Sequence, residues 1–258
     1  MTVRELYAKL DKKIPRALSY AWDNDGLMCC PDGEREVRRV LVALDATDEV
    51  CEKAIEGGYD AILTHHPFIF KGLRAFEDEN AIAAKAIKLV RANIAVMSFH
   101  TRLDALEGGV NDTLAALLGL EEVESFEGEG QPIGRIGKLC EPMSLEAFAG
   151  KVKAVLGAPF VLVSDSGREV RCVAVVGGDG KDFVSLTRAI GADTYVSGRF
   201  DYHSMTDTPD TVGGGVNLIE AGHFYTEFPV CRTLCDIVAE LAPEVECDVY
   251  NGNRIKAV

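Results

Sequence analysis

Hydrophobic and polar positions follow one another along the chain in blocks that predict helices separated by short buried strands. Apolar residues recur at helical spacing between Thr2 and Pro15, and Thr2 with Glu5 has the pattern of a capping box. Short apolar runs predict strands at 39–44, 61–64 and 94–98. Helices are predicted at about 47–58, 80–92 and 109–118, and after Ser144. This alternation is typical of an α/β protein.

The second half of the chain resembles the first. Residues 38–66 superpose on 171–199 without a gap, so that a strand, a helix and a second strand coincide. The next segment agrees as well, because NIAVMSFHTRLD at 93–104 matches VNLIEAGHFYTE at 216–227. We interpret this as an internal duplication; the alternative is the general similarity of any two α/β segments. The predicted domains are one repeat each, residues 1–123 and 124–258.

Composition and charge narrow the classes of function. The chain has 258 residues and a formal net charge of −14 at pH 7. Because such a surface repels phosphate backbones, nucleic acid is disfavoured as a partner. We expect no membrane span, since no apolar run reaches roughly 18 residues, and the charged N-terminal segment does not resemble a secretion signal. We therefore expect a cytoplasmic protein.

The eight cysteines are scattered and contain no CxxC pair. In a chain of this length and predicted location, we expect reduced and mostly buried thiols rather than disulfides. Cys231 and Cys235 are one helical turn apart, but no second pair accompanies them. A structural zinc knuckle is therefore not expected.

Four of the five histidines directly follow predicted apolar strands, and they are His65, His66, His100 and His223. Loops beyond the carboxyl ends of strands converge at one edge of an α/β sheet, where ligands bind. A single such histidine has an ordinary structural explanation, a partly buried ring hydrogen-bonded to a backbone carbonyl. Together, however, they favour a binding site.

Carboxylates accompany two of these histidines at helical spacing. His100 and Asp104 are four residues apart, as are His223 and Glu227, so each pair shares one face of a helical turn. Imidazole nitrogens and carboxylate oxygens suit zinc, manganese, iron, cobalt or nickel. Adjacent residues of a strand point to opposite sides, so His65 and His66 do not easily bind one ion. We therefore predict two neighbouring divalent metal ions, which can activate water and polarise a substrate oxygen.

At these residues the sequence resembles the Nif-three-like family of dinuclear metal-centre proteins, which are type-two homologues of GTP cyclohydrolase I. The resemblance extends over nearly the whole chain. It is carried by WDNDGLM (22–28), LTHHPFIF (63–70), SFHTRLDALEGGVND (98–112), SGRFDYH (197–203) and EAGHFYTE (220–227).

This resemblance implies a set of five metal ligands. Glu227 would bridge the two ions, with His66 and Asp104 on one ion and His65 and His223 on the other. His100 would lie beside the site, where it could transfer a proton or only orient Asp104. The C-terminal part, from about residue 216, would pack on the first repeat and complete the site.

The resemblance also implies fold and assembly. The expected fold is two intertwined α/β repeats with mixed sheets, in the short form without a central insert, and the expected assembly is a homohexamer. Two positions depart from the family pattern. Arg199 replaces a common acidic residue, where it could bind an anionic substrate or simply pair with a surface acid. Asp25 replaces an apolar residue, which puts the local packing in question.

Two functions remain open at this point. The first is a metal-dependent hydrolase acting on a small, anionic or nucleotide-like molecule, with GTP ring opening implied by the resemblance alone. The second is a non-catalytic metal-binding protein, either a metal-handling factor or a scaffold for metal-dependent interactions. A nucleotide-binding regulator without metal would require the clustered histidines to be coincidental. The glycine-rich segment GGDGKDF (177–183) fits neither a dinucleotide motif nor a P-loop and is read as a turn.

Overall fold

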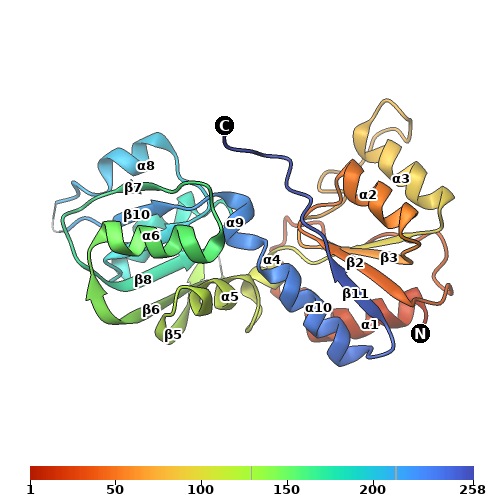
Figure 1. The fold of residues 1–258 in the computed structure, drawn as a ribbon, viewed down its shortest axis with the longest axis horizontal. Helices are drawn as coiled ribbons and strands as arrows, with labels where there is room; N and C mark the ends of the chain where they lie inside the picture. Colours follow the sequence, from red (N-terminus) through yellow and green to blue (C-terminus); the bar gives the residue numbers. More distant parts are fainter. Residues whose placement is uncertain (129, 213) are drawn as a thin grey trace. The chain divides into compact units, whose positions relative to one another are not determined.

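The chain forms two compact units, each built around a mixed β-sheet with helices packed on it (Figure 1). The computed structural model describes residues 1–128, 130–212 and 214–258. Unit 1 comprises residues 1–103 and 230–256, and unit 2 comprises residues 104–229 with 257–258. The predicted α/β class with mixed sheets is confirmed. The division into repeats at residue 123 concerns duplication of the sequence rather than compactness, and it stays a prediction.

Unit 1 has a five-stranded sheet in the order β1-β4-β3-β2-β11. Its strands are β1 (Gly26–Cys29), β2 (Arg39–Ala43), β3 (Ala61–Thr64), β4 (Ala95–Ser98) and β11 (Glu246–Val249). Only β1 runs antiparallel to its neighbour. The helices are α1 (Val3–Lys13), α2 (Asp48–Glu56), α3 (Ala81–Arg91) and α10 (Val230–Leu241), with a 3-10 turn at Arg16–Leu18. Helices α2 and α3 cover one face of the sheet, and α1 and α10 cover the other (Figure 1).

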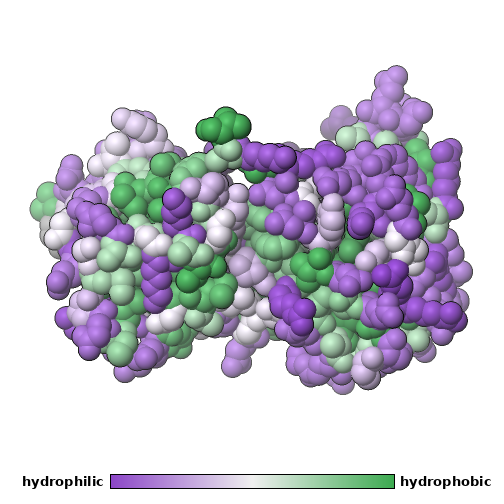
Figure 2. All heavy atoms as spheres, viewed as in Figure 1, coloured by the Kyte–Doolittle hydropathy of each residue, from purple (hydrophilic) through white to green (hydrophobic). Residues whose placement is uncertain are grey.

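Local sequence signals account for the helix boundaries of unit 1. Thr2 and Glu5 form the predicted capping box at the start of α1. Thr47 caps α2, which ends at Gly57, and Asn80 caps α3. The buried core lies between the sheet and α2 and α3, and includes Leu41, Val50, Ala54, Ile62, Leu89 and Val96. Hydrophilic side chains cover most of the visible surface over α2 (Figure 2).

Unit 2 has a six-stranded sheet in the order β5-β6-β8-β9-β10-β7. Its strands are β5 (Glu121–Gly128), β6 (Gln131–Met143), β7 (Leu162–Ser164), β8 (Val170–Val176), β9 (Thr194–Ser197) and β10 (Asn217–Glu220). Its helices are α5 (Val110–Leu117), α6 (Leu145–Leu156), α7 (Val184–Ala189), α8 (Tyr202–Asp207) and α9 (His223–Glu227), with a 3-10 turn at Lys181–Phe183. Ser144 caps α6 as predicted. The short helix α4 (Thr101–Ala105) contains the boundary between the units.

The two sheets share the same central register. Val40 of β2 lies opposite Ala61 of β3, and Val173 of β8 lies opposite Thr194 of β9. These are the residues that the ungapped alignment superposes. The loops that follow the next strands, β4 and β10, differ in length by one residue. His100 lies two residues beyond Ser98, the end of β4, whereas His223 lies three residues beyond Glu220, the end of β10. The sequence match between the two His-x-x-x-acid segments therefore requires an inserted residue in the loop after β10.

An aspartate holds the beginning of two aligned strands, β2 in unit 1 and β8 in unit 2. In unit 1, Asp60 Oδ2 accepts hydrogen bonds from the amides of Arg38 (2.8 Å) and Arg39 (3.0 Å). In unit 2, Asp193 Oδ2 accepts from the amide of Cys172 (2.7 Å) and lies 3.1 Å from the amide of Arg171. Both carboxylates accept hydrogen bonds from two successive backbone amides, which gives a physical reason for an aspartate at both aligned positions.

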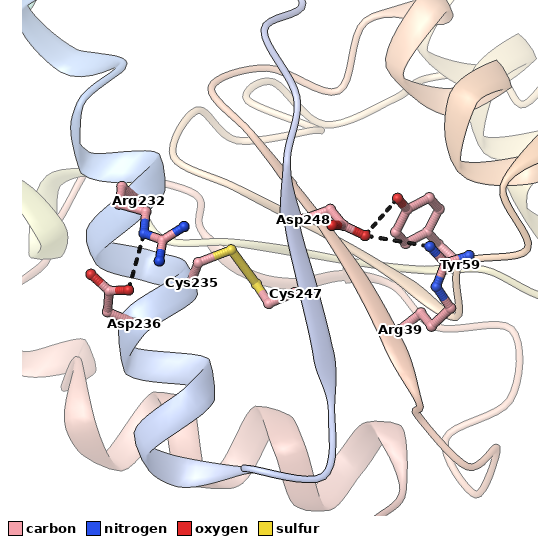
Figure 3. The surroundings of a disulfide bond; sticks show 7 residues. All are labelled: Arg39, Tyr59, Arg232, Cys235, Asp236, Cys247 and Asp248. Carbon is pink, nitrogen blue, oxygen red and sulfur yellow. Dashed lines mark hydrogen bonds and ion pairs between the residues drawn. A yellow bond between two sulfur atoms is a disulfide. The ribbon is translucent and has the colours of Figure 1, made fainter.

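Cys235 of α10 and Cys247 of β11 form a disulfide, with their Cα atoms 5.6 Å apart (Figure 3). The expectation of reduced cysteines is therefore wrong for this pair. It failed because residues 12 apart in the sequence become neighbours only when β11 joins β2. The expectation of mostly buried thiols is also wrong, since of the six cysteines outside this disulfide only Cys51 and Cys231 are buried. Within the described ranges, no helix is long and apolar enough to cross a membrane.

Candidate metal centre

His65 stands at the end of β3 and is completely buried. Its Nδ1 lies 3.0 Å from the carbonyl oxygen of Phe99, which can only accept a hydrogen bond. The proton must therefore be on Nδ1, and the lone pair of the neutral ring is on Nε2. The strand end itself is held by a 2.8 Å hydrogen bond between the hydroxyls of Thr64 and Ser98. His65 is thus held in the tautomer that can bind a metal ion through Nε2.

The neighbouring His66 is oriented by a carboxylate. Its Nδ1 lies 2.7 Å from Oδ1 of Asp45, which follows β2. Asp45 was not predicted as part of the site, because nothing in its local sequence connects it with a histidine 21 residues away. A carboxylate behind an imidazole fixes the ring and increases the basicity of the nitrogen that faces a metal.

His100 is also backed by a carboxylate, that of Asp23. His100 Nδ1 and Asp23 Oδ1 are 2.9 Å apart, and the second oxygen of Asp23 accepts from the amide (3.1 Å) and the hydroxyl (2.6 Å) of Thr101. Burial raises the pKa of Asp23, but the hydrogen bond and charge of His100 and the bonds from Thr101 outweigh it and lower the pKa to about 2. Asp23 is therefore ionised at neutral pH and holds His100 with Nε2 presented outward.

Asp25 is buried, and cationic side chains balance its charge. Its carboxylate accepts from Arg102 Nε at 3.0 Å and from Arg16 at 2.8 Å, and also from the amide of His100 at 3.1 Å. Arg102 has no exposed surface, and its pKa is lowered by burial but raised more strongly by Asp11 and Asp25. Asp25 is thus part of a buried ion pair that also fixes the backbone of His100.

The three histidines of unit 1 converge. Their ring centroids are 5.1 Å apart for His65 and His66, 5.4 Å for His65 and His100, and 5.8 Å for His66 and His100. Each ring offers one nitrogen, and these three nitrogens lie within 4.8 Å of one another. Imidazole nitrogens at this separation have the chemistry of ligands for borderline divalent ions.

In unit 2, the side chains of His223 and Glu227 lie in contact across one turn of α9. Nε2 of His223 lies 3.0 Å from Oε2 of Glu227, whose side chain is 5% exposed. Glycine backbone approaches this pair closely: Gly178 has φ of +67°, and a Cβ there would overlap Oε1 of Glu227. A Cβ at Gly198 would come within 2.7 Å of the Cα of His223. Only glycine leaves room for the pair at both places.

Asp104 begins unit 2 within α4 and is 9% exposed. The fully buried side chain of Asn111 connects the backbone of Asp104 with the backbone that follows β8. Asn111 Nδ2 donates to the carbonyls of Asp104 (3.2 Å) and Ile133 (2.6 Å), and its Oδ1 accepts from the amide of Gly177 (2.8 Å). The segment GGDGKDF therefore packs against the candidate ligands, and nothing in these contacts suggests a phosphate loop.

Comparison with known proteins identifies the family. Residues 1–254 match the family model described as Duf34/NIF3 (NGG1p interacting factor 3). The chain belongs to this family. A Duf34/NIF3 relative from Clostridium perfringens, called GTP cyclohydrolase 1 type 2 homolog, is 31% identical over 249 residues, which cover 93% of this chain and 92% of the relative.

Solved structures share the fold. A hypothetical protein of Staphylococcus aureus aligns with a TM-score of 0.92 and 26% identity, covering 100% of this chain and 99% of that one. A Bacillus cereus protein related to NIF3 aligns with a TM-score of 0.87 and 24% identity over the same shares of both chains. The resemblance inferred from the sequence motifs is thus confirmed.

This Duf34/NIF3 chain has histidine and glutamate groups that could hold a metal ion. Within unit 1 the predicted His65, His66 and His100 lie together, and within unit 2 His223 and Glu227 lie together. Sequence reasoning missed Asp23, Asp45 and Asn111, the residues that orient these groups. Asp23 lies in the family motif WDNDGLM, which was a usable signal. Arg199 is exposed, and its role stays a prediction.

Proposed function

We propose that this protein is a metal-dependent hydrolase with a dinuclear centre. The proposed ligands are His65, His66, Asp104, His223 and Glu227, with Glu227 bridging two divalent ions of zinc, iron, manganese, cobalt or nickel. The observation that carries the proposal is the convergence of three imidazoles, each with Nδ1 engaged by an acceptor. Structural histidines need no such common orientation, whereas metal ligands do.

The side chains have separate roles in this proposal. Bound divalent ions would supply Lewis-acid polarisation of the substrate and a water of lowered pKa. His100 accepts or delivers a proton through Nε2, because its Nδ1 is held by ionised Asp23. Asp23 is a positioning residue for that step. Asp45 does the same for His66 and keeps its ring in one orientation.

We propose a small, anionic and nucleotide-like substrate. The support is the name of the relatives, GTP cyclohydrolase 1 type 2 homolog. Opening the imidazole part of guanine formally requires hydrolysis at its C8 carbon, a reaction that needs an activated water and a proton carrier. We further propose a homohexamer, from the family resemblance alone; light scattering of the purified protein in solution would test it.

Metal counting tests the proposed centre first. The purified protein would be loaded separately with each candidate ion, and bound metal measured by elemental analysis. We expect two ions per chain, and fewer in His65→Ala, Asp104→Ala and His223→Ala. The control is His203→Ala, which removes an exposed histidine outside the proposed site. If every ligand variant keeps the full amount of metal, the proposed centre is refuted.

Turnover then separates a hydrolase from a metal-handling protein. Change in purine absorbance would report ring opening of GTP by the loaded protein. His100→Ala should retain both ions and lower kcat by about 10²- to 10⁴-fold, the usual contribution of a general acid or base. If His100→Ala loses an ion, His100 is a ligand instead. Stable metal binding without turnover on any nucleotide would favour the metal-handling function.

A further inference from the structure

An exposed aromatic corner adjoins the histidines of unit 1. Trp22 is the only tryptophan of the chain and is 58% exposed, and Phe70 is 46% exposed. Their ring centroids are 6.2 Å apart at 80°, so the two rings form a right angle. The ring of His100 lies 6.4 Å from Trp22 and 6.2 Å from Phe70, nearly perpendicular to both. The corner therefore opens directly beside the proposed proton carrier.

This corner is built and held, unlike a single exposed hydrophobic residue. Tyr20 stacks on Trp22, with ring centroids 5.3 Å apart at 15°, and Trp22 is still 58% exposed. The amide of Tyr20 donates to Thr101 Oγ1 at 3.1 Å, and Asn24 Nδ2 donates to the carbonyl of Ile69 at 2.5 Å. The segments that carry Trp22 and Phe70 are thus bonded to each other and to the loop of His100. Pre-ordered aromatic faces of this kind reduce the entropy that binding would otherwise cost.

We propose that the outer face of Trp22 stacks on a planar nitrogen heterocycle of the substrate, with Phe70 contacting the edge of that ring. Base–aromatic stacking tolerates any flat heterocycle, and the adjoining His100 supplies the polar group that the edge of a nucleobase requires. The corner thereby places the ring next to the proposed metal centre, where a hydrolysis at ring carbon would occur. This inference rests on the proposed function, since it assigns the part of the substrate that the centre would act on.

Fluorescence of the single tryptophan provides a direct test. The metal-loaded protein would be titrated with GTP, with guanosine, and with inorganic triphosphate, which has no ring. We expect saturable quenching by GTP and guanosine and none by triphosphate, because only a stacked ring perturbs Trp22. Quenching by triphosphate equal to that by GTP, or no quenching by either nucleotide, would overturn the inference.

Variants then measure the contribution of stacking without relying on fluorescence. Calorimetry should show GTP binding about 5- to 150-fold weaker in Trp22→Ala. Trp22→Phe and Phe70→Leu should fall between this variant and the wild type. The matched control is Phe160→Ala, which removes a similarly exposed ring (56%) in unit 2 and should leave binding unchanged. All three positions are exposed, so circular dichroism should show that all variants fold.

The outcomes distinguish this inference from the proposed function. Nucleotide quenching without turnover supports the stacking site and counts against the hydrolase. Turnover with unchanged Kd and KM in Trp22→Ala overturns the stacking site and leaves the hydrolase standing. Tryptophan emission that depends on protein concentration and does not respond to nucleotides would mean that the corner is a contact between copies of the chain, which also overturns the inference.

Discussion

The two units place functional side chains at the ends of matching strands by different physical means. In unit 1, β3 ends in Thr64 and is followed by His65 and His66; at the aligned positions of unit 2, β9 ends in Ser197 and is followed by Gly198 and Arg199. Unit 1 thus carries imidazoles where unit 2 carries a glycine that allows α9 to approach. The same backbone pattern therefore supports two different ways of holding a candidate metal ligand in place.

The difference lies in what stands behind each ligand. In unit 1, hydrogen bonds hold the imidazoles: the acceptors are the buried carboxylate of Asp23, the exposed carboxylate of Asp45 and the carbonyl of Phe99. In unit 2, glycine backbone lies against Glu227 and leaves it one position. The stability of unit 1 should therefore depend on its charged and polar side chains. The stability of unit 2 should instead be lowered by the addition of a single methyl group to a glycine.

The largest effect should come from the carboxylate network of unit 1. Arg102→Met removes one partner of a fully buried ion pair, and we expect the free energy of unfolding to fall by about 3 to 5 kcal/mol. Arg16→Met is the matched control, because Arg16 binds the same Asp25 from a half-exposed position and should cost about 1 kcal/mol or less. Urea unfolding measures both. Equal losses would show that burial does not set the contribution of these pairs.

The disulfide allows a second comparison, at the strand that adjoins β2 in unit 1 and β8 in unit 2. That strand is β11 in unit 1, tied to α10 by Cys235, and β6 in unit 2, which is joined to β5 as a hairpin. Cys235→Ser opens the short loop and should cost about 3 kcal/mol under oxidising conditions. The same loss should follow reduction of the wild-type protein with dithiothreitol. Cys140→Ser, at an exposed cysteine of unit 2, is the control, and a loss of similar size there would contradict the assignment.

The close approach of glycine in unit 2 can be broken by one methyl group. Gly178→Ala adds a Cβ that overlaps Glu227 and should cost about 2 kcal/mol, as well as lowering the amount of bound metal. Gly58→Ala in unit 1 has nearly the same φ, +65° against +67°, with nothing within 4 Å of the new Cβ. It should cost about 1 kcal/mol through backbone strain alone. Urea unfolding would measure the stability of both variants, and elemental analysis would measure their bound metal. Equal losses in the two variants would contradict the packing argument.

The smallest expected effect compares the two strand-holding aspartates. Burial raises the pKa of Asp60, but hydrogen bonds from the amides of Arg38 and Arg39 and from Arg35 lower it below the usual value. A carboxylate with a lowered folded pKa stabilises the protein above its unfolded pKa, and this stability is lost as pH falls through the folded value. Asp60→Asn should therefore cost about 1 to 2 kcal/mol at neutral pH, and the difference from wild type should shrink below about pH 4.

Asp193→Asn is the comparison in unit 2. Beyond the two amides, Asp193 Oδ1 accepts from the hydroxyl of Thr194 at 2.8 Å, whereas Asp60 also binds the guanidinium of Arg35 at 2.6 Å. We expect the loss in Asp193→Asn to be the smaller of the two. Unfolding curves recorded at several pH values would decide this, and a pH-independent loss in Asp60→Asn would contradict the ionic explanation.

Much of the fold could be predicted from the sequence because its signals are local. The caps at Thr2, Thr47 and Ser144 stand where the helices begin. Each depends on a side chain and a backbone amide only three residues apart. The strand register of the aligned segments was equally accessible, since a repeated pattern of apolar residues implies a repeated pleat. The disulfide was not, because it joins an element to the edge of a sheet.

The sequence by itself determined the kinds of element, their order, and the location of histidines at strand ends, since these follow from periodicity and from chain neighbours. Only the tertiary structure decided which residues orient those histidines, how Asp25 is tolerated, and why Gly178 must lack a side chain. Asp45 acts on His66 across 21 positions, and Gly178 lies against a residue of a later helix. Such contacts depend on packing between distant segments, which no local pattern of residues records.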